Sequence, residues 1–334
     1  MMPTRFPRTP NYSFPGQVAP VDEELLAYVK ENYRELRELQ RRSAAGISGM
    51  GMRAANGIGK TVGAGAFGLG GAITSDAPAG GAPDRAAMAA AMAKMEEGFA
   101  AMVRKRVHDP ETAEALIPRD YRMGCKRLVV EIDYFETYNR DNVTLVDLRK
   151  GPITEITPTS VVTERGEHEI DVLVLATGFD ALTGPLTRIE VRGRGGRLLA
   201  DDWRDGPSAY LGLMANGYPN LFMVTGPGSP SVLSNMVVSI EQHVDWLSDA
   251  IARHRDAGVT VMEPTVEAQE EWLDHVHEVS ADTPYVHPSC NSWYVGANIA
   301  GKTRTILPYT GGVGRYRDIC DEVAADGYRG FVLA

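Results

Sequence analysis

The chain has 334 residues, a formal net charge of −10, 43% hydrophobic residues and 23% charged residues. These proportions are typical of a globular protein of one large domain or two, and they exclude a disordered or fibrous chain. The acidic balance also argues against general binding to nucleic acid or anionic lipid, because those surfaces repel an acidic chain without a local basic patch.

Cysteine content and hydrophobicity indicate the compartment. The three cysteines, Cys125, Cys290 and Cys320, are too few and too scattered to predict a disulfide framework or a thiolate metal site. The N-terminal segment lacks the apolar core of a signal peptide. The longest uncharged run is shorter than the ~20 residues of a membrane span. We therefore expect a soluble, cytoplasmic protein with no resident metal and with neither nucleic acid nor membrane as a partner.

Helical patterns dominate the first 120 residues. A helix is predicted from Asp22, its N-cap, to about residue 42, because apolar residues recur on one face. Residues 44–82 are rich in Gly, Ala and Met without a period, which favours a loop or a loosely ordered cap. Two more helices are expected, from about residue 83 to residue 107 and over residues 110–117.

Short segments rich in β-branched residues follow from residue 126 and predict strands. Residues 172–176 are continuously apolar and predict a strand covered on both faces, and residues 220–228 predict a second one. Helices are expected over about 234–254, 265–279 and 314–325, with a closing strand over 330–334. Strands that lead through Gly-rich turns into helices indicate an α/β fold of the nucleotide-binding type, with the helical region as an insertion or cap.

Two glycine motifs in the helical region are weak candidates for phosphate loops. Gly63–Gly68 fits G-x-G-x-x-G, but a dinucleotide loop needs a buried strand before it, and none is predicted there. Gly59-Lys60-Thr61 resembles the end of a phosphate loop, but Ala54 stands where the first glycine is required. A flexible Gly/Ala tract is the favoured interpretation.

Two other constellations also favour ordinary roles. His275 and His277 would point their rings about 200° apart on a helix, so they cannot chelate one ion from one face. With His287, they are expected on a solvated polar face. Ser229 and Ser231 lack the G-x-S-x-G elbow, which disfavours a serine hydrolase.

Several blocks of sequence, in order, resemble a known family. They are residues 6–16 with 18–20, 124–147 (GCKRLVVEIDYFETYNRDNVTLVD), 169–184 (EIDVLVLATGFDALTG), 218–246, 292–302 (SWYVGANIAGK) and 311–333. Together they resemble the C-terminal part of the Baeyer–Villiger monooxygenases, the FAD- and NADPH-dependent enzymes typified by phenylacetone and cyclohexanone monooxygenase. The resemblance covers nearly the whole chain except residues 44–82.

The resemblance implies a partial fold of two dinucleotide-binding domains with a helical insertion. Residues 1–20 would end an NADP-domain segment, 21–120 would form the insertion, 121–150 would return to the NADP domain, and 151–334 would be the C-terminal part of the FAD domain. The family's N-terminal part, with its Gly-rich loops for FAD and NADP, has no counterpart in this sequence. A truncated chain or fragment is therefore expected.

The same resemblance assigns roles to the basic pair of the GCKR block. It implies that Arg127 is the catalytic arginine, which stabilises the anionic flavin peroxide, and that Lys126 meets the 2′-phosphate of NADPH. A guanidinium suits the first role because it does not lose its proton. Without the resemblance, the pair is a basic cap at the start of a strand.

Further cofactor and substrate contacts are implied in the second half of the chain. The residues are Thr177 and Gly178 beside a cofactor, Asn235 and Met236 at the pyrimidine end of the flavin, Ser231, Val232 and Leu233 in the substrate pocket, and Trp293 on a loop over the nicotinamide. The alternatives are a core strand with an ordinary turn, a helix start capped by Ser234, and an aromatic side chain that packs on the core.

The expected function is insertion of one oxygen atom of O2 into a ketone, or oxidation of a sulfide, with FAD and NADPH. The alternative is a catalytically inactive fragment or subunit that needs a partner chain with the FAD-binding half. Strands that pair with a missing half leave open edges and an apolar face in water. In that case we expect the chain alone to bind FAD weakly or not at all.

Overall fold

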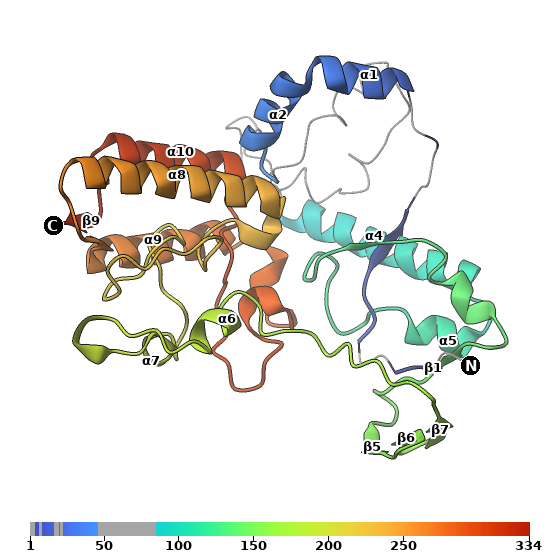
Figure 1. Ribbon diagram of the computed structural model, residues 1–334. Coiled ribbons are helices and arrows are strands. Elements are labelled where there is room, and N and C mark those ends of the chain that lie inside the picture. Colours follow the sequence, from blue (N-terminus) through green and yellow to red (C-terminus); the bar gives the residue numbers. More distant parts are fainter. Residues whose placement is uncertain (1–3, 7–8, 17–19, 21–22, 46–84) are drawn as a thin grey trace. The chain divides into compact units, whose positions relative to one another are not determined.

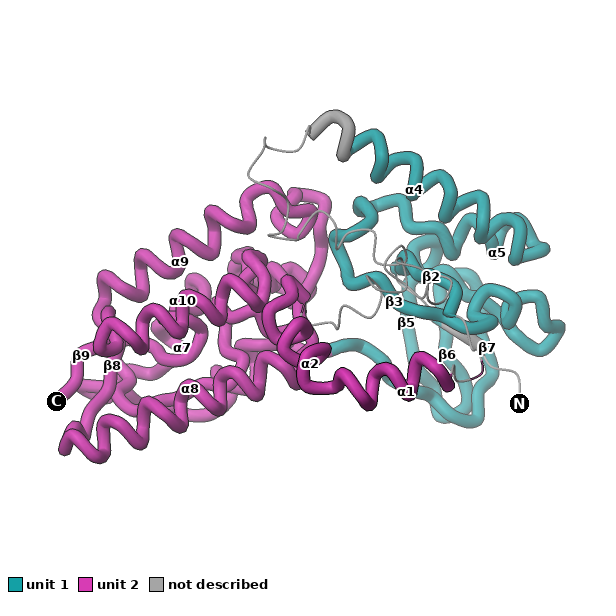
Figure 2. Tube along the Cα trace, turned by 90° about the horizontal axis from the view of Figure 1, so that it is seen from above, with its two compact units in different colours: residues 1–19, 81–178 teal, residues 20–80, 179–334 magenta. Residues whose placement is uncertain are grey.

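The computed structural model describes residues 4–6, 9–16, 20, 23–45 and 85–334. It divides into two compact units, residues 1–19 with 81–178 and residues 20–80 with 179–334 (Figure 2). Asp22, the two glycine motifs of residues 59–68 and most of the predicted loop over 44–82 lie outside the described residues. The assignment of the chain to NADP-domain, insertion and FAD-domain segments stays a prediction.

The first unit combines two helices with short strands (Figure 1). Its elements are β1 (Thr4–Arg5), β2 (Ser13–Pro15), α4 (Arg85–Arg106), α5 (Pro110–Ala115), β3 (Val129–Glu131), the 3-10 turn η1 (Glu136–Asn139), β4 (Thr144–Leu145), β5 (Ile153–Ile156), β6 (Ser160–Thr163) and β7 (Gly166–Glu169). Strand β2 pairs in parallel with β3, and β1 pairs in parallel with β4. Strands β5, β6 and β7 form an antiparallel meander.

Buried aromatic side chains hold the first unit together. The Tyr12 ring lies edge-on to Phe99 of α4, at a centroid distance of 5.0 Å, and edge-on to Tyr121 at 5.7 Å. All three side chains are buried. Each such pair adds about 0.5–1.5 kcal/mol beyond the burial of its area. The segment that leads from Tyr121 into β3 is therefore fixed against a rigid core.

The second unit is built mainly of helices (Figure 1). Its elements are α1 (Glu23–Glu31), α2 (Tyr33–Arg42), α6 (Gly184–Thr187), η2 (Arg194–Gly196), α7 (Leu199–Asp202), η3 (Ser231–Leu233), α8 (Met236–Asp256), β8 (Met262–Pro264), α9 (Val266–Ser280), η4 (Pro284–Val286), η5 (Trp293–Val295), α10 (Val313–Ala325) and β9 (Phe331–Leu333). Strands β8 and β9 pair antiparallel.

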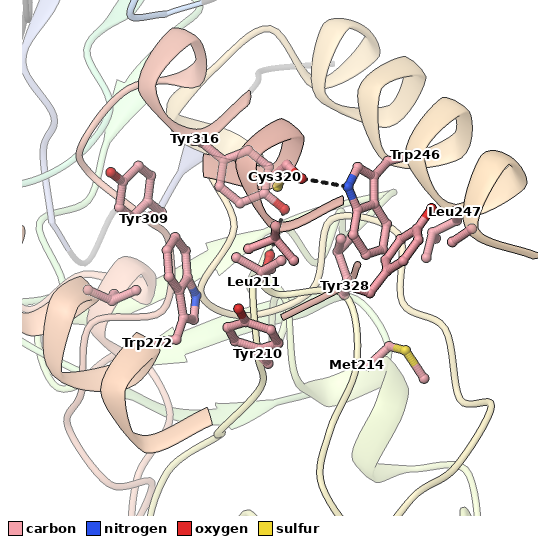
Figure 3. Packing of buried hydrophobic residues seen from close by; sticks show 14 of the residues in the cluster. Tyr210, Leu211, Met214, Trp246, Leu247, Trp272, Tyr309, Tyr316, Cys320 and Tyr328 are labelled. Carbon is pink, nitrogen blue, oxygen red and sulfur yellow. Dashed lines mark hydrogen bonds between the residues drawn. The ribbon is translucent and has the colours of Figure 1, made fainter. Parts of the chain in front are cut away.

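The core of the second unit lies between α8, α9 and α10 (Figure 3). The indole Nε1 of Trp246 donates to the Cys320 carbonyl at 2.9 Å, which ties α8 to α10. The Tyr316 hydroxyl donates to the Leu211 carbonyl at 2.6 Å, which ties α10 to the turn around residue 211. Burial raises the pKa of the Cys320 thiol to about 12, so this side chain stays protonated and serves as packing.

The helices predicted after residue 83 match the structure. Helices α4, α5, α8, α9 and α10 confirm the five segments predicted after residue 83. The helix predicted over 22–42 is instead interrupted at Asn32, which has φ −104° and ψ 19°. Its side-chain amide donates to the Tyr28 carbonyl at 2.9 Å, and such local bonds compete with helix continuation. Within the described part of the chain, no helix is both long and apolar enough to cross a bilayer.

The two strands predicted to be buried are wrong. Residues 172–176 are irregular and exposed, at 65% for Val172 and 79% for Val174. A doubly covered strand forms only when other strands bond its two edges, and no described strand pairs with this segment. Residues 220–228 are also irregular, because Asn220 takes a φ of 59° and bonds through its side chain to the Thr260 carbonyl.

Candidate functional site

Lys126 is a half-buried cation that lies over an aromatic ring. Its Nζ is 4.3 Å from the centroid of the buried Tyr121 ring. The Tyr121 hydroxyl donates to the Pro10 carbonyl at 2.8 Å, which fixes the ring. Burial lowers the pKa of Lys126, against the charge of Asp120, because leaving water disfavours the ammonium form. Among the residues that the structure describes, Lys126 forms no salt bridge with a carboxylate, although the Asp120 charge acts on it.

Arg127 is exposed next to this cation. Its main-chain carbonyl accepts from the Asn11 amide nitrogen at 3.2 Å, so the segment before β2 supports the backbone here. Its guanidinium forms no ion pair with any described carboxylate. The sequence-predicted basic pair thus consists of one cation held against the protein and one that is free in solvent.

Thr177 and Gly178 lie at the end of the first unit. Both are exposed in irregular backbone, and Gly178 has a φ of +87°. No hydrogen bond within the described residues joins either of them to Lys126 or Arg127. Their predicted cofactor contact stays a prediction.

The loop after residue 224 is positioned by two glycines that approach each other closely. Gly212 has a φ of +69°, and a Cβ there would lie 2.6 Å from the Ser229 nitrogen. A Cβ on Gly226 would lie 2.5 Å from the Gly212 carbonyl oxygen. Ser229 Oγ donates to the Gly226 carbonyl at 2.7 Å, which is a turn-stabilising bond rather than a nucleophile's arrangement. The loop that carries Ser231 is therefore set by backbone contact.

Residues 231–235 form one compact turn that leads into Met236, the first residue of α8. Ser231 is buried with a φ of +43°, which is strained for a side chain other than glycine. Its Oγ lies 3.9 Å from the Met236 sulfur, and its carbonyl accepts from Ser234 Oγ at 2.7 Å. Val232 and Leu233 are half-buried. The structure thus brings together the predicted pocket residues and Met236.

Asn235 is the N-cap of α8, which corrects the sequence expectation of Ser234. Its Oδ1 accepts from the Val237 nitrogen at 3.2 Å, and its own N–H donates to the Ala45 carbonyl at 2.8 Å. Ser234 Oγ instead bonds to the carbonyl of residue 231 and to Ser239 Oγ. An asparagine side chain that caps a helix leaves its amide nitrogen available to a ligand.

Trp293 is the first residue of the turn η5. Hydrogen bonds of Leu307 connect this turn to the loop that carries Ser231. Ser292 Oγ accepts from the Tyr294 nitrogen at 3.3 Å and caps the turn. Leu307 donates its N–H to the Tyr294 carbonyl at 2.8 Å and accepts from the Gly228 nitrogen at 2.7 Å. The half-buried Trp293 ring lies 4.5 Å from that of Tyr294. Backbone bonds at residue 307 therefore join the two loops.

The three histidines that were weighed as a metal site each have a different partner. His275 Nε2 lies 3.4 Å from the Tyr309 hydroxyl, His277 Nε2 lies 3.1 Å from Thr305 Oγ1, and His287 Nδ1 lies 2.8 Å from Ser289 Oγ. Within the described ranges, no group of three or more His, Cys, Asp or Glu side chains could hold a metal ion.

The candidate site residues fall into two groups. Lys126, Arg127, Thr177 and Gly178 belong to the first unit, and the residues from Ser231 to Trp293 belong to the second. A half-buried ammonium is a group that can bind a phosphate dianion. The contact of Lys126 with the 2′-phosphate of NADPH stays a prediction. A strand, Gly-rich loop and helix that could cradle the pyrophosphate of FAD is not found among the described residues.

Sequence reasoning missed Tyr121 and Gly212. Tyr121 lies five residues before Lys126, and no fixed spacing marks an aromatic ring as the support of a lysine. Gly212 is far from residue 226 in sequence, so only the fold reveals their contact. The only sequence signal for this contact was an aromatic residue, Tyr121, a few positions before the basic pair Lys126 and Arg127.

Comparisons with known proteins agree with one another. No protein-family model matches the chain. It is 48% identical over 234 residues to acetone monooxygenase (methyl acetate-forming) of Gordonia sp. (strain TY-5), which covers 70% of this chain and 44% of that protein. It is 40% identical over 226 residues to cyclohexanone 1,2-monooxygenase of Acinetobacter sp., which covers 67% of this chain and 40% of that one. The chain thus spans less than half the length of these relatives.

Solved structures extend the likeness to the whole chain. A steroid monooxygenase bound to NADP matches with a TM-score of 0.82 at 39% identity, and a closed cyclohexanone monooxygenase matches with 0.84 at 38%. Each match covers 99% of this chain and 62% of the other. The expected α/β flavoprotein fold is confirmed.

Proposed function

Because the chain is homologous to the C-terminal part of the Baeyer–Villiger monooxygenases, we propose that it acts in an FAD- and NADPH-dependent oxidation. The reaction inserts one oxygen atom of O2 into a ketone or oxidises a sulfide. The name of the 48% identical relative, an acetone monooxygenase, makes a small ketone the first substrate to test.

The observation that carries this proposal is the half-buried Lys126 ammonium over the Tyr121 ring. The Tyr121 ring holds the ammonium at 4.3 Å, so Lys126 is ordered before any ligand arrives. A preorganised cation loses little entropy when it binds a phosphate. Lys126 would hold the 2′-phosphate of NADPH and so favour NADPH over NADH.

Arg127 supplies the catalytic charge in this proposal. Its guanidinium is exposed, and no described carboxylate forms an ion pair with it. It would stabilise negative charge that develops beside the flavin. Bound FAD supplies the activation of O2, and NADPH supplies the reducing hydride.

In the first unit, Thr177 and Gly178 would contact a cofactor. In the second unit, the amide nitrogen of Asn235 and the Met236 side chain would contact the pyrimidine end of the flavin. Trp293 would cover the nicotinamide. Val232 and Leu233, beside Ser231, offer apolar surface for the substrate.

An inactive fragment or subunit is the second candidate, because two observations favour it. Within the described residues, no strand pairs with the exposed apolar segment of Val172 and Val174, and no cradle for the FAD pyrophosphate is found. In this form the chain needs a partner polypeptide that carries the FAD-binding half.

A test of flavin binding separates the two candidates. The purified chain is incubated with FAD, desalted, and measured for flavin absorbance and for NADPH consumption with acetone. We expect little or no retained flavin from the chain alone. Stoichiometric flavin together with acetone-dependent NADPH consumption would show that the chain is a complete enzyme and would rule out the second candidate.

A further inference from the structure

A groove of about 510 Å³ lies between helices α8 and α10 of the second unit, which run side by side (Figures 1 and 2). Small-molecule sites typically have volumes of about 300–1,000 Å³. The buried Trp246 and Tyr328 rings contribute to the lining (Figure 3), and Ala324 and Ala325 add apolar surface. The α8–α10 groove therefore has the size and the apolar surface to hold a small organic molecule.

Gln242 of α8 lines this groove with an amide whose hydrogen bonds are not made. The residue is 3% exposed, and neither its Nε2 nor its Oε1 has an oxygen or nitrogen partner among the described residues. Burial raises the pKa of the Cys320 thiol and Gln242 acts against that rise, but a thiol is only a weak hydrogen-bonding group. An amide buried in this way destabilises the fold, so a ligand that bonds to both of its polar atoms would remove that cost.

The same groove carries charged side chains of both signs. Asp245 and Asp249 stand one turn apart on α8, and Asp321 and Arg317 belong to α10. None of the four forms an ion pair with another described residue. Burial lowers the pKa of Arg317 and raises that of Asp321, because both groups lose water on folding. The Arg317 Nε is buried without a hydrogen-bond partner among the described residues, so it can donate to a ligand.

The second guanidinium of the groove, that of Arg253, is already engaged. It donates to the Ala324 carbonyl at 3.3 Å and lies 5.9 Å from the centroid of the Tyr328 ring. Of the two guanidiniums in the lining, that of Arg317 is therefore the one left for an anionic group.

We propose that the α8–α10 groove binds an α-amino acid with an aliphatic side chain, as its zwitterion. The carboxylate would accept from Gln242 Nε2 and Arg317 Nε, and the ammonium would donate to Gln242 Oε1. A carboxylate only accepts hydrogen bonds and an ammonium only donates them, and an α-amino acid carries both on one carbon. This head group matches an amide, whose donor and acceptor also share one carbon. The inference goes beyond the proposed function and does not rest on it.

The charges of the groove favour a zwitterion over an ion of one sign. An anion alone would be repelled by the three aspartates, and a cation alone would be repelled by Arg317. A zwitterion gives each of these groups an opposite charge. The aliphatic side chain would cover the apolar surface of Ala324 and Ala325, which removes that surface from water.

Isothermal titration of the purified full chain with L-leucine tests the proposal. Two analogues serve as matched controls, since 4-methylpentanoic acid lacks the ammonium of leucine and 3-methylbutan-1-amine lacks its carboxylate. We expect saturable binding of L-leucine at one site, and binding of each analogue that is at least about tenfold weaker, because each leaves one end of the Gln242 amide unbonded.

The Gln242→Met variant separates a ligand contact from a structural role. Met has a similar volume but neither the donor nor the acceptor. L-leucine affinity should fall at least about tenfold. The thermal midpoint without ligand should stay unchanged or rise, because an apolar side chain replaces an amide buried without partners. A lower midpoint with unchanged L-leucine affinity would assign Gln242 to the fold and overturn the proposal.

Two neighbouring acidic residues of α10 provide a control that does not alter the core. Asp321 and Glu322 are both exposed, but only Asp321 lines the groove. Asp321→Asn should weaken L-leucine binding at least about threefold, since it removes a charge that attracts the ammonium, and Glu322→Gln should leave the affinity unchanged. Equal effects of these two substitutions would contradict the proposal. So would the absence of saturable L-leucine binding to the parent chain, or an analogue that binds as tightly as L-leucine.

Discussion

The Lys126 ammonium lies 4.3 Å from the centroid of the Tyr121 ring, and the ring is fixed by the bond of its hydroxyl to the Pro10 carbonyl. A cation over an aromatic face is stabilised by ~0.5–2 kcal/mol without being neutralised. An ion pair with a carboxylate would instead cancel the charge. This arrangement keeps a positive charge both ordered and available.

Replacing Lys126 with Met should weaken NADPH binding by at least about tenfold and leave NADH binding unchanged, because only NADPH carries the 2′-phosphate. Tyr121→Leu should also weaken NADPH binding, but by less, since it removes the ring that supports Lys126 and leaves the charge in place. Tyr121→Phe keeps the ring and serves as the control. Isothermal titration with both nucleotides measures these differences, and equal loss for NADPH and NADH would refute the assigned contact.

His243 should make the protein less stable in acid. Its Nδ1 accepts from the Thr225 nitrogen at 2.8 Å, its ring lies 5.5 Å from that of Tyr316, and Arg317 adds a positive charge nearby. Burial, with that charge, lowers the pKa of His243 from 6.5 to about 4. The folded state therefore binds fewer protons than the unfolded state, and stability present above pH 6.5 is lost as the pH falls towards 4.

The contribution of His243 can be isolated by substitution. His243→Gln removes the titration and keeps an acceptor for the Thr225 nitrogen. Between about pH 7 and about pH 4, the free energy of unfolding should fall by roughly 2–3 kcal/mol less in the variant than in the parent. Urea unfolding at several pH values measures this difference. The prediction would be contradicted if the free energy of unfolding changed with pH equally in the variant and the parent.

Arg106 of α4 should be essential to the first unit. It bonds to Glu131 of β3 at 2.6 Å and to Glu136 at 2.6 Å, and the Glu131 side chain is only 6% exposed. Arg106→Met would leave that carboxylate buried and unpaired, which costs about 3–5 kcal/mol. On the same helix, Arg104 pairs with Glu114 in solvent, so Arg104→Met should change stability little. Equal shifts of the denaturant midpoint in the Arg106→Met and Arg104→Met variants would contradict this prediction.

Gly212→Ala should disrupt the loop that carries Ser231. A Cβ at Gly212 would lie 2.6 Å from the Ser229 nitrogen, in addition to the strain of a φ of +69°. The expected cost is roughly 2–4 kcal/mol. Gly258 has a similar φ of +73° with no atom within 4 Å of such a Cβ, so Gly258→Ala measures the strain alone. A thermal midpoint lowered no further by Gly212→Ala than by Gly258→Ala would rule out the steric contact.

The sequence alone was sufficient to predict most of the helices and to identify the family that the chain resembles. Helices α8, α9 and α10 follow from apolar residues at local spacings of three and four, because helix hydrogen bonds close within a few residues. Helix α4 follows from its Ala/Met-rich composition. The resemblance of the GCKR and ATGF blocks to the Baeyer–Villiger monooxygenases is a property of residue order, and the comparisons confirmed it. Roles that were assigned residue by residue from that resemblance stay predictions.

Tertiary structure decided what depends on distant partners. Residues 172–176 have the composition of a buried strand, but a strand exists only where another backbone bonds its edge. The support of Lys126 by Tyr121 and the contact of Gly212 with the residue 226 loop join segments through packing rather than through a repeating pattern. The local sequence therefore determines where helices form and where basic residues stand. Contacts between distant segments determine whether a strand forms and which side chains and loops are fixed.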